Sequence, residues 1–257
     1  MFKGAAKALS EAGLKKAMDT TGVDLPALWA VMTVETRGCG FLADRRPVIL
    51  FERHVFHRRT NGKFSARHPD ISNATAGGYG PSGPTQYEKL ARAIKLDRKA
   101  ALESCSWGLG QVMGFNAARV GYRDAEAMVG AMCVSEDAQF QAMMNFIVAA
   151  ELTVHLKRQD WARFAYRYNG VDFQKNKYDE KLARAYARFS TGPMPDLRVR
   201  TAQLYLTYLG YAPRGVDGWF GEGTQKALMR FQVAAGVAPS GKLDEETLAR
   251  LEAKAAG

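Results

Sequence analysis

The sequence has few cysteines and no long hydrophobic run. Its 257 residues include three cysteines, Cys39, Cys105 and Cys133, which lie far apart and form no C-x-x-C pair. An odd number at such spacing argues against a disulfide framework and against a cysteine-rich zinc site. No segment approaches the roughly 20 consecutive apolar residues that a membrane-spanning helix needs. These absences predict a soluble globular protein that is made in a reducing compartment.

Signals for export and for several common chemistries are missing as well. Residues 1–10 contain two lysines, but no apolar block follows them, so we expect no secretory signal. The chain has no glycine-rich nucleotide loop and no Ser-His-Asp arrangement. His54 and His57 are three residues apart, but no second cluster supplies the further ligands of a metal site. We therefore predict an activity that uses neither a cofactor nor a metal ion.

Acidic residues are the scarcer charge, which gives the chain a formal net charge of +10. The excess is uneven. Residues 193–257 contain 8 basic and 7 acidic residues, whereas residues 1–192 contain the other 28 basic and 19 acidic residues, a net of +9. A basic surface attracts polyanions, which include nucleic acids, anionic lipids and an anionic bacterial envelope. Charge alone does not distinguish these partners, but it indicates that residues 1–192 are the part of the chain that attracts a polyanion.

Proline and glycine mark a boundary near residue 192. Residues 190–195 read STGPMP and follow a long helical pattern. Two prolines and a glycine end the helix and form a short, stiff connector. We therefore predict an N-terminal domain over residues 1–191, a linker over 192–196 and a C-terminal domain over 197–257. We find no internal repeat and no low-complexity tract.

The N-terminal domain is predicted to be mostly helical with one irregular lobe. Apolar residues recur at helical spacing in five stretches, whereas residues 62–84 are rich in Gly, Ser, Asn, Thr and Pro and lack this spacing. We expect residues 62–84 to form a loop with room for a short hairpin. The predicted helices cover residues 14–20, 26–36, 86–102, 137–157 and 161–168.

The C-terminal domain shows the spacing of amphipathic helices. Leu206 and Leu209 share one helical face, and Ala227, Leu228 and Phe231 share another. Each set forms a stripe that a helix can bury against its neighbours. About sixty residues are few, but such a helical trio can fold alone.

A glycine-rich turn separates these two helices and has a distinctive sequence. Residues 216–221 read VDGWFG, and the next helix has Thr224 in its first turn. With GKLD at residues 241–244, this pattern resembles the small three-helix peptidoglycan-binding domain of bacterial and phage wall-lytic proteins. The resemblance implies that the domain binds peptidoglycan. The matching motif residues are Asp217, Gly218, Phe220, Gly221 and Thr224.

A single glutamate closes a strongly apolar helix in the N-terminal domain. Residues 28–34 read LWAVMTV, Glu35 follows, and glycines at positions 38 and 40 turn the chain away. A carboxyl group held against apolar surface has its charged form disfavoured, so its pKa rises and it stays protonated near neutral pH. Such a group can donate a proton to a departing sugar oxygen. An exposed glutamate at a helix end would show the same local pattern, so this interpretation depends on other motifs.

Two further motifs follow Glu35 along the chain. Residues 106–114 read SWGLGQVMG, and residues 165–170 read AYRYNG. In this order the three elements resemble the lysozyme-like superfamily, with a catalytic glutamate, a Ser-x-Gly-Leu-x-Gln segment and a Tyr-Asn-Gly segment. The resemblance implies that side-chain amides bind sugar hydroxyl and acetamido groups, and that aromatic rings lie against sugar faces. The implied substrate-binding residues are Ser106, Trp107, Gln111, Tyr168 and Asn169.

A narrower resemblance rests on four segments. FERHVF at residues 51–56, the segment 106–114, YNG at 168–170 and YD at 178–179 together look like the N-acetylmuramidase domain of phage endolysins. The resemblance implies a mainly α fold, in which a lysozyme-like helical domain with a small irregular or β lobe precedes the three-helix domain. It also implies hydrolysis of the β-1,4 bond between N-acetylmuramic acid and N-acetylglucosamine, with Glu35 as the catalytic acid.

The sequence does not identify the second carboxylate that glycosidases usually need. The two carboxyl groups are about 5–5.5 Å apart in retaining enzymes and about 6.5–9.5 Å apart in inverting ones. Glu52, in the Phe-Glu-Arg-His segment, and Asp44 are equal candidates, and Asp70 in the polar lobe ranks behind them. A glutamate that acts without a fixed partner is a further option.

These resemblances make a phage-type modular endolysin the expected class. We expect a monomer that is made in the host cytoplasm, passes a holin-type pore and lyses the host wall from the periplasm by acting on peptidoglycan. The basic N-terminal domain would add attraction to an anionic envelope, and the basic stretch over residues 175–188 is a candidate membrane-active face. Nucleic acid is not an expected partner.

Two alternatives stay open. A lytic transglycosylase shares the glutamate, the Gly-Leu-x-Gln and the Tyr-Asn-Gly elements, but it closes an anhydro ring instead of adding water. A non-catalytic wall-binding virion protein would keep the fold without turnover, so Glu35→Gln would change nothing measurable. Product chemistry separates these alternatives from hydrolysis.

Overall fold

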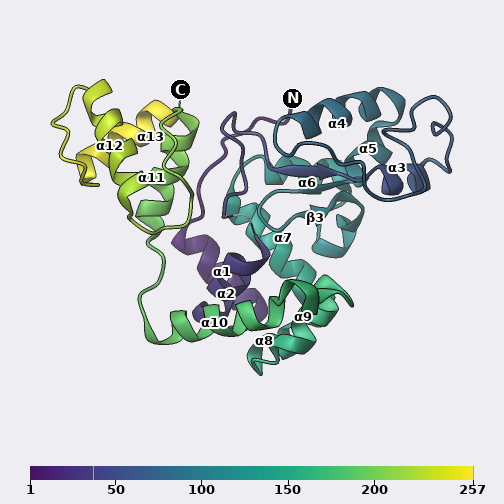
Figure 1. Cartoon of the computed structure of the whole chain (residues 1–257), viewed down its shortest axis with the longest axis horizontal. Helices are drawn as coiled ribbons and strands as arrows, with labels where there is room; N and C mark the ends of the chain where they lie inside the picture. The colour runs from purple at the N-terminus through teal and green to yellow at the C-terminus, as the bar shows by residue number, and fades with distance from the viewer. Residues whose placement is uncertain (37, 257) are drawn as a thin grey trace.

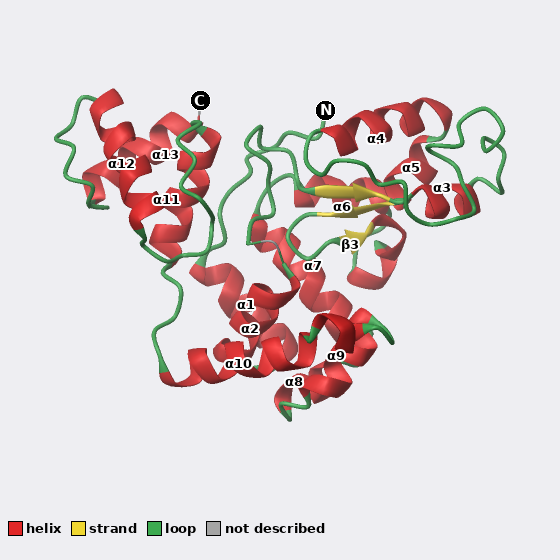
Figure 2. Cartoon of the chain, viewed as in Figure 1, coloured by secondary structure: helices red, strands yellow, loops and turns green. Residues whose placement is uncertain are grey.

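The computed structural model describes residues 1–36 and 38–256 and is mainly helical, as predicted (Figure 1). Figure 2 shows a small sheet beside the helices and a separate group of three helices at the C-terminal end. None of the described helices contains an apolar stretch of the length that a membrane-spanning helix requires. The elements are α1 (Glu11–Thr21), α2 (Leu25–Glu35), β1 (Ile49–Phe51), α3 (Arg53–Arg59), α4 (Thr85–Leu96), α5 (Arg98–Glu103), β2 (Cys105–Trp107), β3 (Val112–Met113), η1 (Gly114–Asn116), η2 (Ala118–Val120), α6 (Ala125–Met132), α7 (Glu136–Ala149), α8 (Thr153–Lys157), α9 (Trp161–Asn169), η3 (Phe173–Asn176), α10 (Tyr178–Thr191), α11 (Leu197–Tyr208), α12 (Glu222–Ala234) and α13 (Glu245–Ala256).

Two of the predicted long helices are each split in two. The helix predicted over residues 86–102 consists of α4 and α5, because Asp97 is extended with φ −158° and its Oδ1 accepts from Ala100 N at 2.9 Å. Asp97 thereby acts as the N-cap of a new helix. The helix predicted over residues 137–157 consists of α7 and α8. It is interrupted between them because Glu151 adopts a left-handed backbone with φ +57°.

A three-stranded antiparallel sheet forms the small lobe. Its order is β1-β2-β3, with Ile49 opposite Trp107 and Ser106 opposite Met113. The hairpin expected within residues 62–84 is absent, because these residues, all of them described, form turns and bends. Strands of two or three residues are too short to show an alternating pattern, so they could not be predicted from the sequence.

The helix that carries Glu35 runs through the core of the N-terminal domain. Residues 27–32 of α2 are buried, and the helix packs against α10. A helix that is buried all round has no polar face. Its end is therefore the place where a polar side chain can leave the core and meet a cavity. This arrangement positions the site described below.

In the C-terminal domain, Gln203 of α11 holds the turn that precedes α12. Its Nε2 donates to Asp217 Oδ1, to the Trp219 carbonyl and to Thr224 Oγ1 at 2.9–3.0 Å. Its Oε1 accepts from the backbone amides of Asp217 and Gly218 at 2.9 Å. One buried amide thus satisfies several polar groups of the turn at once.

Gln232 of α12 repeats this arrangement at the turn before α13. Its Nε2 donates to Thr247 Oγ1 at 3.1 Å, and its Oε1 accepts from Gly241 N at 2.9 Å. Gly218 and Gly241 both have left-handed backbones, and each lies six positions before its threonine, Thr224 or Thr247. The domain therefore contains two copies of one turn. The prediction of no internal repeat is therefore wrong. The repeat is not evident in the sequence because the two copies share only the spacing of their glycine and threonine.

Candidate active site

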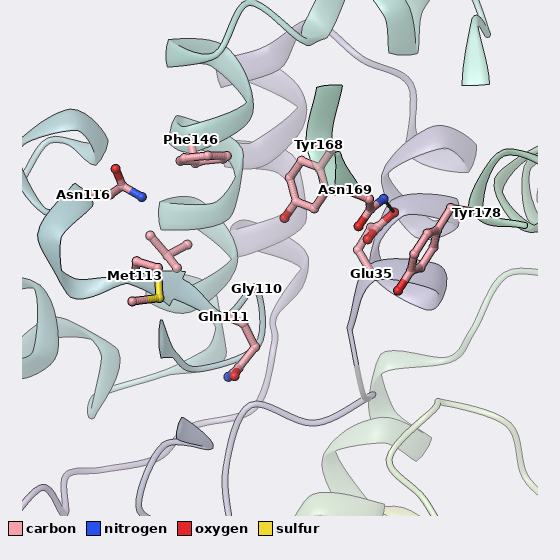
Figure 3. A pocket seen from close by; sticks show the side chains of 10 residues that line it. Glu35, Gly110, Gln111, Met113, Asn116, Phe146, Tyr168, Asn169 and Tyr178 are labelled. Carbon is pink, nitrogen blue, oxygen red and sulfur yellow. Dashed lines mark hydrogen bonds between the residues drawn. The ribbon is translucent and has the colours of Figure 1, made fainter. Parts of the chain in front are cut away.

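Glu35 is the last residue of α2 and lies on the wall of a cavity of about 320 Å³. Figure 3 shows its carboxyl group beside Asn169 and Tyr178, with Gln111 and Phe146 elsewhere around the cavity. The wall is built from the helical region and from the turn between β2 and β3. The lining residues are Glu35, Gly110, Gln111, Val112, Met113, Asn116, Phe146, Tyr168, Asn169 and Tyr178.

Burial makes Glu35 a weak acid. Desolvation is the largest influence and raises the pKa of Glu35 from 4.5 to about 7, although the hydrogen bond from Asn169 and the charge of Lys181 each lower it. The charged form is disfavoured because the surrounding protein does not replace the water that solvates a carboxylate. A substantial fraction of Glu35 is therefore protonated at neutral pH, as a general acid must be.

Asn169 and Tyr168 reach the cavity from the C-terminal end of α9. Nδ2 of Asn169 donates to Oε1 of Glu35 at 3.0 Å, which orients the carboxyl group. The Tyr168 ring stacks on Phe164 with centroids 5.3 Å apart and meets Phe146 edge-on at 6.1 Å. Two such contacts hold the ring in one orientation at the wall. The structure thus brings two of the predicted substrate-binding residues next to Glu35.

Gln111 lies in the turn between β2 and β3, and its side chain is already bonded to the protein. Nε2 donates to the carbonyls of Val48 and Gly108 at 3.1 and 2.7 Å, and Oε1 accepts from Ser106 Oγ at 2.8 Å. Because both amide protons are used, Gln111 can offer a sugar only a remaining lone pair on Oε1. Ser106 is buried and supports Gln111 from behind. Gln111 lines the cavity, whereas Ser106 does not line it and bears on it through its hydrogen bond to Gln111.

The prediction that Trp107 lies against a sugar face is wrong. Its side chain is 0% exposed, and its Nε1 donates to the carbonyl of Leu102 at 3.1 Å. Neighbouring residues of a strand point to opposite faces of the sheet. Because Ser106 turns toward Gln111, Trp107 turns into the core. It is a packing residue whose one donor is satisfied.

Two candidates for the second carboxylate are held by arginines away from this cavity. Among the described residues that line the cavity, Glu35 is the one carboxylic acid. Asp44 pairs with Arg46, with 2.6 Å between Oδ2 and Nη2. Asp70 accepts two hydrogen bonds from Arg92 at 2.6 and 3.2 Å. Such close cations keep both carboxylates ionised and engaged elsewhere.

The third candidate, Glu52, lies at the far end of β1 from the cavity. The Val48 carbonyl, which accepts from Gln111, precedes β1, and Glu52 follows the strand. Four residues of extended chain at about 3.3 Å each separate the two Cα atoms by roughly 13 Å. Oε2 of Glu52 lies 3.1 Å from Nδ1 of His54. The structure therefore places Glu52 beside His54 and not on the wall of the cavity that Glu35 lines.

The histidines of this region do not gather into a metal site. Nδ1 of His57 lies 2.7 Å from Ser65 Oγ, whereas His54 faces Glu52. Across the described ranges, no three His, Cys, Asp or Glu side chains are grouped so that they could hold a metal ion. That the activity needs no metal and no cofactor stays a prediction.

Five side chains on the cavity wall were not assigned to it from the sequence: those of Val112, Met113, Asn116, Phe146 and Tyr178. Tyr178 begins α10 and belongs to a segment that carries the muramidase resemblance, so a signal for it was available. Met113 and Asn116 come directly after the turn that carries Gln111. Phe146 is contributed by α7, which is apolar on several faces. No sequence feature separates Phe146 from its core neighbours.

The motif residues of the C-terminal domain divide into buried and exposed ones. Thr224, at 2% exposed, and Gly218 are buried around Gln203, where both are hydrogen-bonded to its side chain. They are needed for the turn itself. Asp217, Phe220 and Gly221 are exposed, and Phe220 shows 44% of its surface. Contact of these three with peptidoglycan stays a prediction.

A helical domain with a small antiparallel sheet and a desolvated glutamate facing a cavity defines a lysozyme-like protein. Residues 24–190 match the N-acetylmuramidase family, and residues 196–251 match a putative peptidoglycan-binding domain. The first match spans more than half of the chain, so this protein belongs to the N-acetylmuramidase family.

A solved structure supports this membership. It is described as the crystal structure of Burkholderia AP3 phage endolysin and is 42% identical to this chain, with a TM-score of 0.68. The similarity covers 72% of this chain and 71% of the other. Among curated proteins, no sequence matches.

Proposed function

We propose that this protein is an endolysin-type peptidoglycan hydrolase that cleaves the β-1,4 bond between N-acetylmuramic acid and N-acetylglucosamine. The observation that carries the proposal is Glu35, a half-buried and desolvated carboxyl group with a pKa of about 7 on the wall of a 320 Å³ cavity. This volume is typical of small-ligand sites, which start at about 300 Å³. Membership of the N-acetylmuramidase family supports the choice of bond, and the second domain supports the choice of polymer.

Glu35 supplies the proton that the leaving sugar needs. Its protonated carboxyl transfers the proton to the glycosidic oxygen while the bond from that oxygen to C1 of the N-acetylmuramic residue breaks. Positive charge develops at C1, and the new carboxylate of Glu35 stabilises it. Asn169 and Lys181 favour the ionised carboxylate, so they lower the cost of giving up the proton.

A water molecule held in the cavity completes the hydrolysis. Its oxygen adds to C1, and its extra proton returns to the Glu35 carboxylate, so the net reaction consumes one water. We assign no step to Asp44, Glu52 or Asp70, because none of them lines the cavity. Polar groups of Asn116 and Tyr178 lie on the wall and are suited to orient the water.

One observation favours a second candidate, a lytic transglycosylase. With Glu35 as the one carboxylic acid among the described cavity residues, the site has no obvious second group to activate water. In a transglycosylase, a hydroxyl group of the N-acetylmuramic residue itself attacks C1 and closes an anhydro ring. The family match favours water as the attacking group.

The C-terminal domain keeps the enzyme on its polymer, and the charge distribution adds to this. The N-terminal domain has a net charge of +9, which attracts it to an anionic bacterial envelope. Residues 175–188, mostly in α10, contribute to this basic surface. The protein acts as a monomer on the host wall and reaches the periplasm from the cytoplasm through a holin-type pore.

Digestion of purified peptidoglycan by the wild type and by Glu35→Gln tests the proposal. The products are reduced with borohydride and identified by mass spectrometry. Reduced muramic-acid ends that are lost in the variant are the expected result. Anhydro-muramic ends would establish the transglycosylase instead. If neither protein yields products, the protein binds the wall but has no hydrolytic activity.

A further inference from the structure

The C-terminal domain is packed against the N-terminal domain along one side of α11. Ala6 and Phe41 of the N-terminal domain form an apolar cluster with Leu204 and Val216 of the C-terminal domain, and each is 7% exposed or less. The Tyr208 hydroxyl donates to the Ala6 carbonyl at 2.8 Å. The two domains that the linker joins are therefore in direct contact, and the linker is not a loose tether between separate bodies.

A buried ion pair crosses this interface. Arg200 of α11 is 1% exposed and Glu136, the first residue of α7, is 0% exposed. Nη1 of Arg200 bonds Oε2 of Glu136, and Nη2 donates to Oε1 at 3.1 Å. This two-pronged contact is the strong form of an arginine–carboxylate pair. Each domain thus supplies the charge that balances a buried charge of the other.

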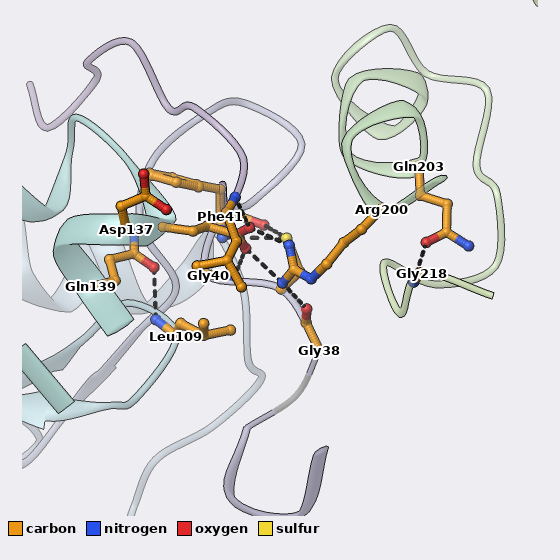
Figure 4. A network of polar contacts seen from close by, with 12 residues as sticks. Gly38, Gly40, Phe41, Leu109, Asp137, Gln139, Arg200, Gln203 and Gly218 are labelled. Carbon is orange, nitrogen blue, oxygen red and sulfur yellow. Dashed lines mark hydrogen bonds and ion pairs between the residues drawn. The ribbon is translucent and has the colours of Figure 1, made fainter. Parts of the chain in front are cut away.

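Both members of the pair also hold the chain segment that follows Glu35 (Figure 4). Oε1 of Glu136 accepts from Gly40 N at 2.9 Å, and Nη2 of Arg200 donates to the Gly38 carbonyl at 2.5 Å. The N-terminal domain therefore fixes Gly40, and the C-terminal domain fixes Gly38.

A short hydrogen-bonded path connects Gly38 to Glu35. Gly38 N donates to Thr36 Oγ1 at 3.1 Å, and Thr36 N donates to the Met32 carbonyl at 3.2 Å. Thr36 is the C-cap of α2 and directly follows Glu35. The position of Gly38 therefore bears on where α2 ends and on how Glu35 leaves the core.

We propose that Arg200 is a positioning residue for Glu35, supplied to the catalytic domain by the peptidoglycan-binding domain. The inference rests on the role proposed above for Glu35. By holding Gly38, Arg200 keeps the end of α2 closed and water away from the carboxyl group. The domain that binds the wall thus also completes the site that cuts it.

Release of Gly38 has a definite effect on the acid. Desolvation is the largest cause of the raised pKa of Glu35, so water admitted at the end of α2 lowers that pKa toward 4.5. The other groups that face Glu35 come from α9 (Tyr168 and Asn169) and from α10 (Tyr178 and Lys181), and none of them is hydrogen-bonded to Arg200 in the described structure. An ionised Glu35 cannot donate, so the alkaline limb of the activity moves to lower pH.

Arg200→Lys in the full-length protein tests the proposal. Lysine keeps a positive charge opposite Glu136, but its single ammonium lacks the fork that reaches Glu136 and Gly38 together. The matched control is Arg250→Lys, because Arg250 forms an exposed pair with Glu246 at 2.8 Å. The substrate is a soluble peptidoglycan fragment, so that anchoring to the wall does not contribute to the rate.

We expect kcat of Arg200→Lys to fall between about tenfold and a hundredfold, as a shift of roughly 1 Å in a catalytic group can cause. The alkaline limb should move to lower pH, with KM and the circular dichroism spectrum unchanged and the control like the wild type. Wild-type kcat and pH profile in Arg200→Lys would overturn the proposal.

A double variant separates positioning from stability. Arg200→Met alone leaves Glu136 as a buried charge without its partner, which destabilises a protein strongly. Adding Glu136→Gln removes that charge and retains an oxygen that can accept from Gly40, while Gly38 stays unbonded. A positioning role predicts that the double variant regains thermal stability but keeps the low kcat and the shifted profile. Recovery of kcat together with stability would show that Arg200 is only structural.

The same assay with Glu35→Gln tells the two proposals apart. If Glu35→Gln keeps its activity, the acid role fails and the positioning role fails with it. If Glu35→Gln is inactive while Arg200→Lys matches the wild type, only the positioning role fails.

Discussion

Asn169 and Glu35 are 134 positions apart in the sequence, yet the Asn169 side chain donates a hydrogen bond of 3.0 Å to the Glu35 carboxyl group. This contact opposes the effect of burial, because burial raises the pKa of Glu35 and the hydrogen bond lowers it. The balance leaves a carboxyl group that can both hold a proton near neutral pH and give it up.

Replacing Asn169 should move the pH profile of the enzyme. Wild-type activity is expected to fall as pH rises through about 7, where Glu35 loses its proton. Asn169→Leu removes a hydrogen bond that lowers this pKa and keeps the site apolar, so the alkaline limb should shift to higher pH. We also expect kcat to fall about tenfold, because the carboxyl group is no longer oriented.

The measurement is kcat/KM against pH on a soluble fragment. Asn176→Leu, at an exposed position in η3, is the control and should keep the wild-type profile. An alkaline limb that stays in place in Asn169→Leu would show that the hydrogen bond does not influence the catalytic acid.

Glu35→Gln should stabilise the fold at alkaline pH. The pKa of Glu35 is about 7 in the folded protein and 4.5 without burial, so the folded state binds more protons between these values and loses stability as pH rises through them. The difference corresponds to at most about 3 kcal/mol. Glutamine carries no such cost.

Urea unfolding at pH 8 and pH 4.5 measures this effect. We expect Glu35→Gln to exceed the wild type by about 1–3 kcal/mol at pH 8 and to equal it at pH 4.5. The exposed Glu88→Gln should show no difference at either pH. Equal stability of Glu35→Gln and wild type at pH 8 would mean that Glu35 is not desolvated.

Neither Asp44 nor Glu52 should be essential for turnover. Asp44 is bound to Arg46, and Glu52 lies beside His54 at the far end of β1. We therefore expect Asp44→Asn and Glu52→Gln to keep kcat within about threefold of the wild type, a loss below that of a removed catalytic group. Loss of several orders of magnitude in one of them, with the fold intact by circular dichroism, would identify it as the second carboxylate.

Trp107→Phe should weaken the fold and leave substrate binding alone. The smaller ring leaves a cavity and the Leu102 carbonyl loses its donor, which together cost about 1–3 kcal/mol. KM for a soluble fragment should not change. Trp161→Phe, at a half-buried ring that packs on Tyr186, should destabilise less. A raised KM in Trp107→Phe would instead support the predicted contact between Trp107 and a sugar.

Local patterns in the sequence predicted the helix that carries Glu35 and two residues next to it. The apolar run before Glu35 predicted a buried helix with an acid at its end, and the structure has this in α2. Asn169 and Tyr168 were found through their motif. Asp97 was misread because an N-cap inside a long apolar pattern looks like one more polar residue on the solvent side.

Features that depend on distant partners could not be predicted in this way. Whether Gln111 has free amide protons depends on the Val48 and Gly108 carbonyls, which only the fold brings to it. Arg200 looks like any basic residue of an amphipathic helix until Glu136, 64 positions away, is placed opposite. Hydrogen bonds and ion pairs between residues far apart in the sequence could therefore not be predicted, whereas helices with a regular apolar spacing could.

Whether Glu35 is protonated at neutral pH is tested most directly by a titration of its carboxyl group. The ¹³C chemical shift of that carboxyl, assigned by its absence in Glu35→Gln, is followed from pH 3 to pH 9 in the folded protein. We predict a midpoint near 7. A midpoint near 4.5 would contradict it, because Glu35 would then be ionised at neutral pH and could not protonate the glycosidic oxygen.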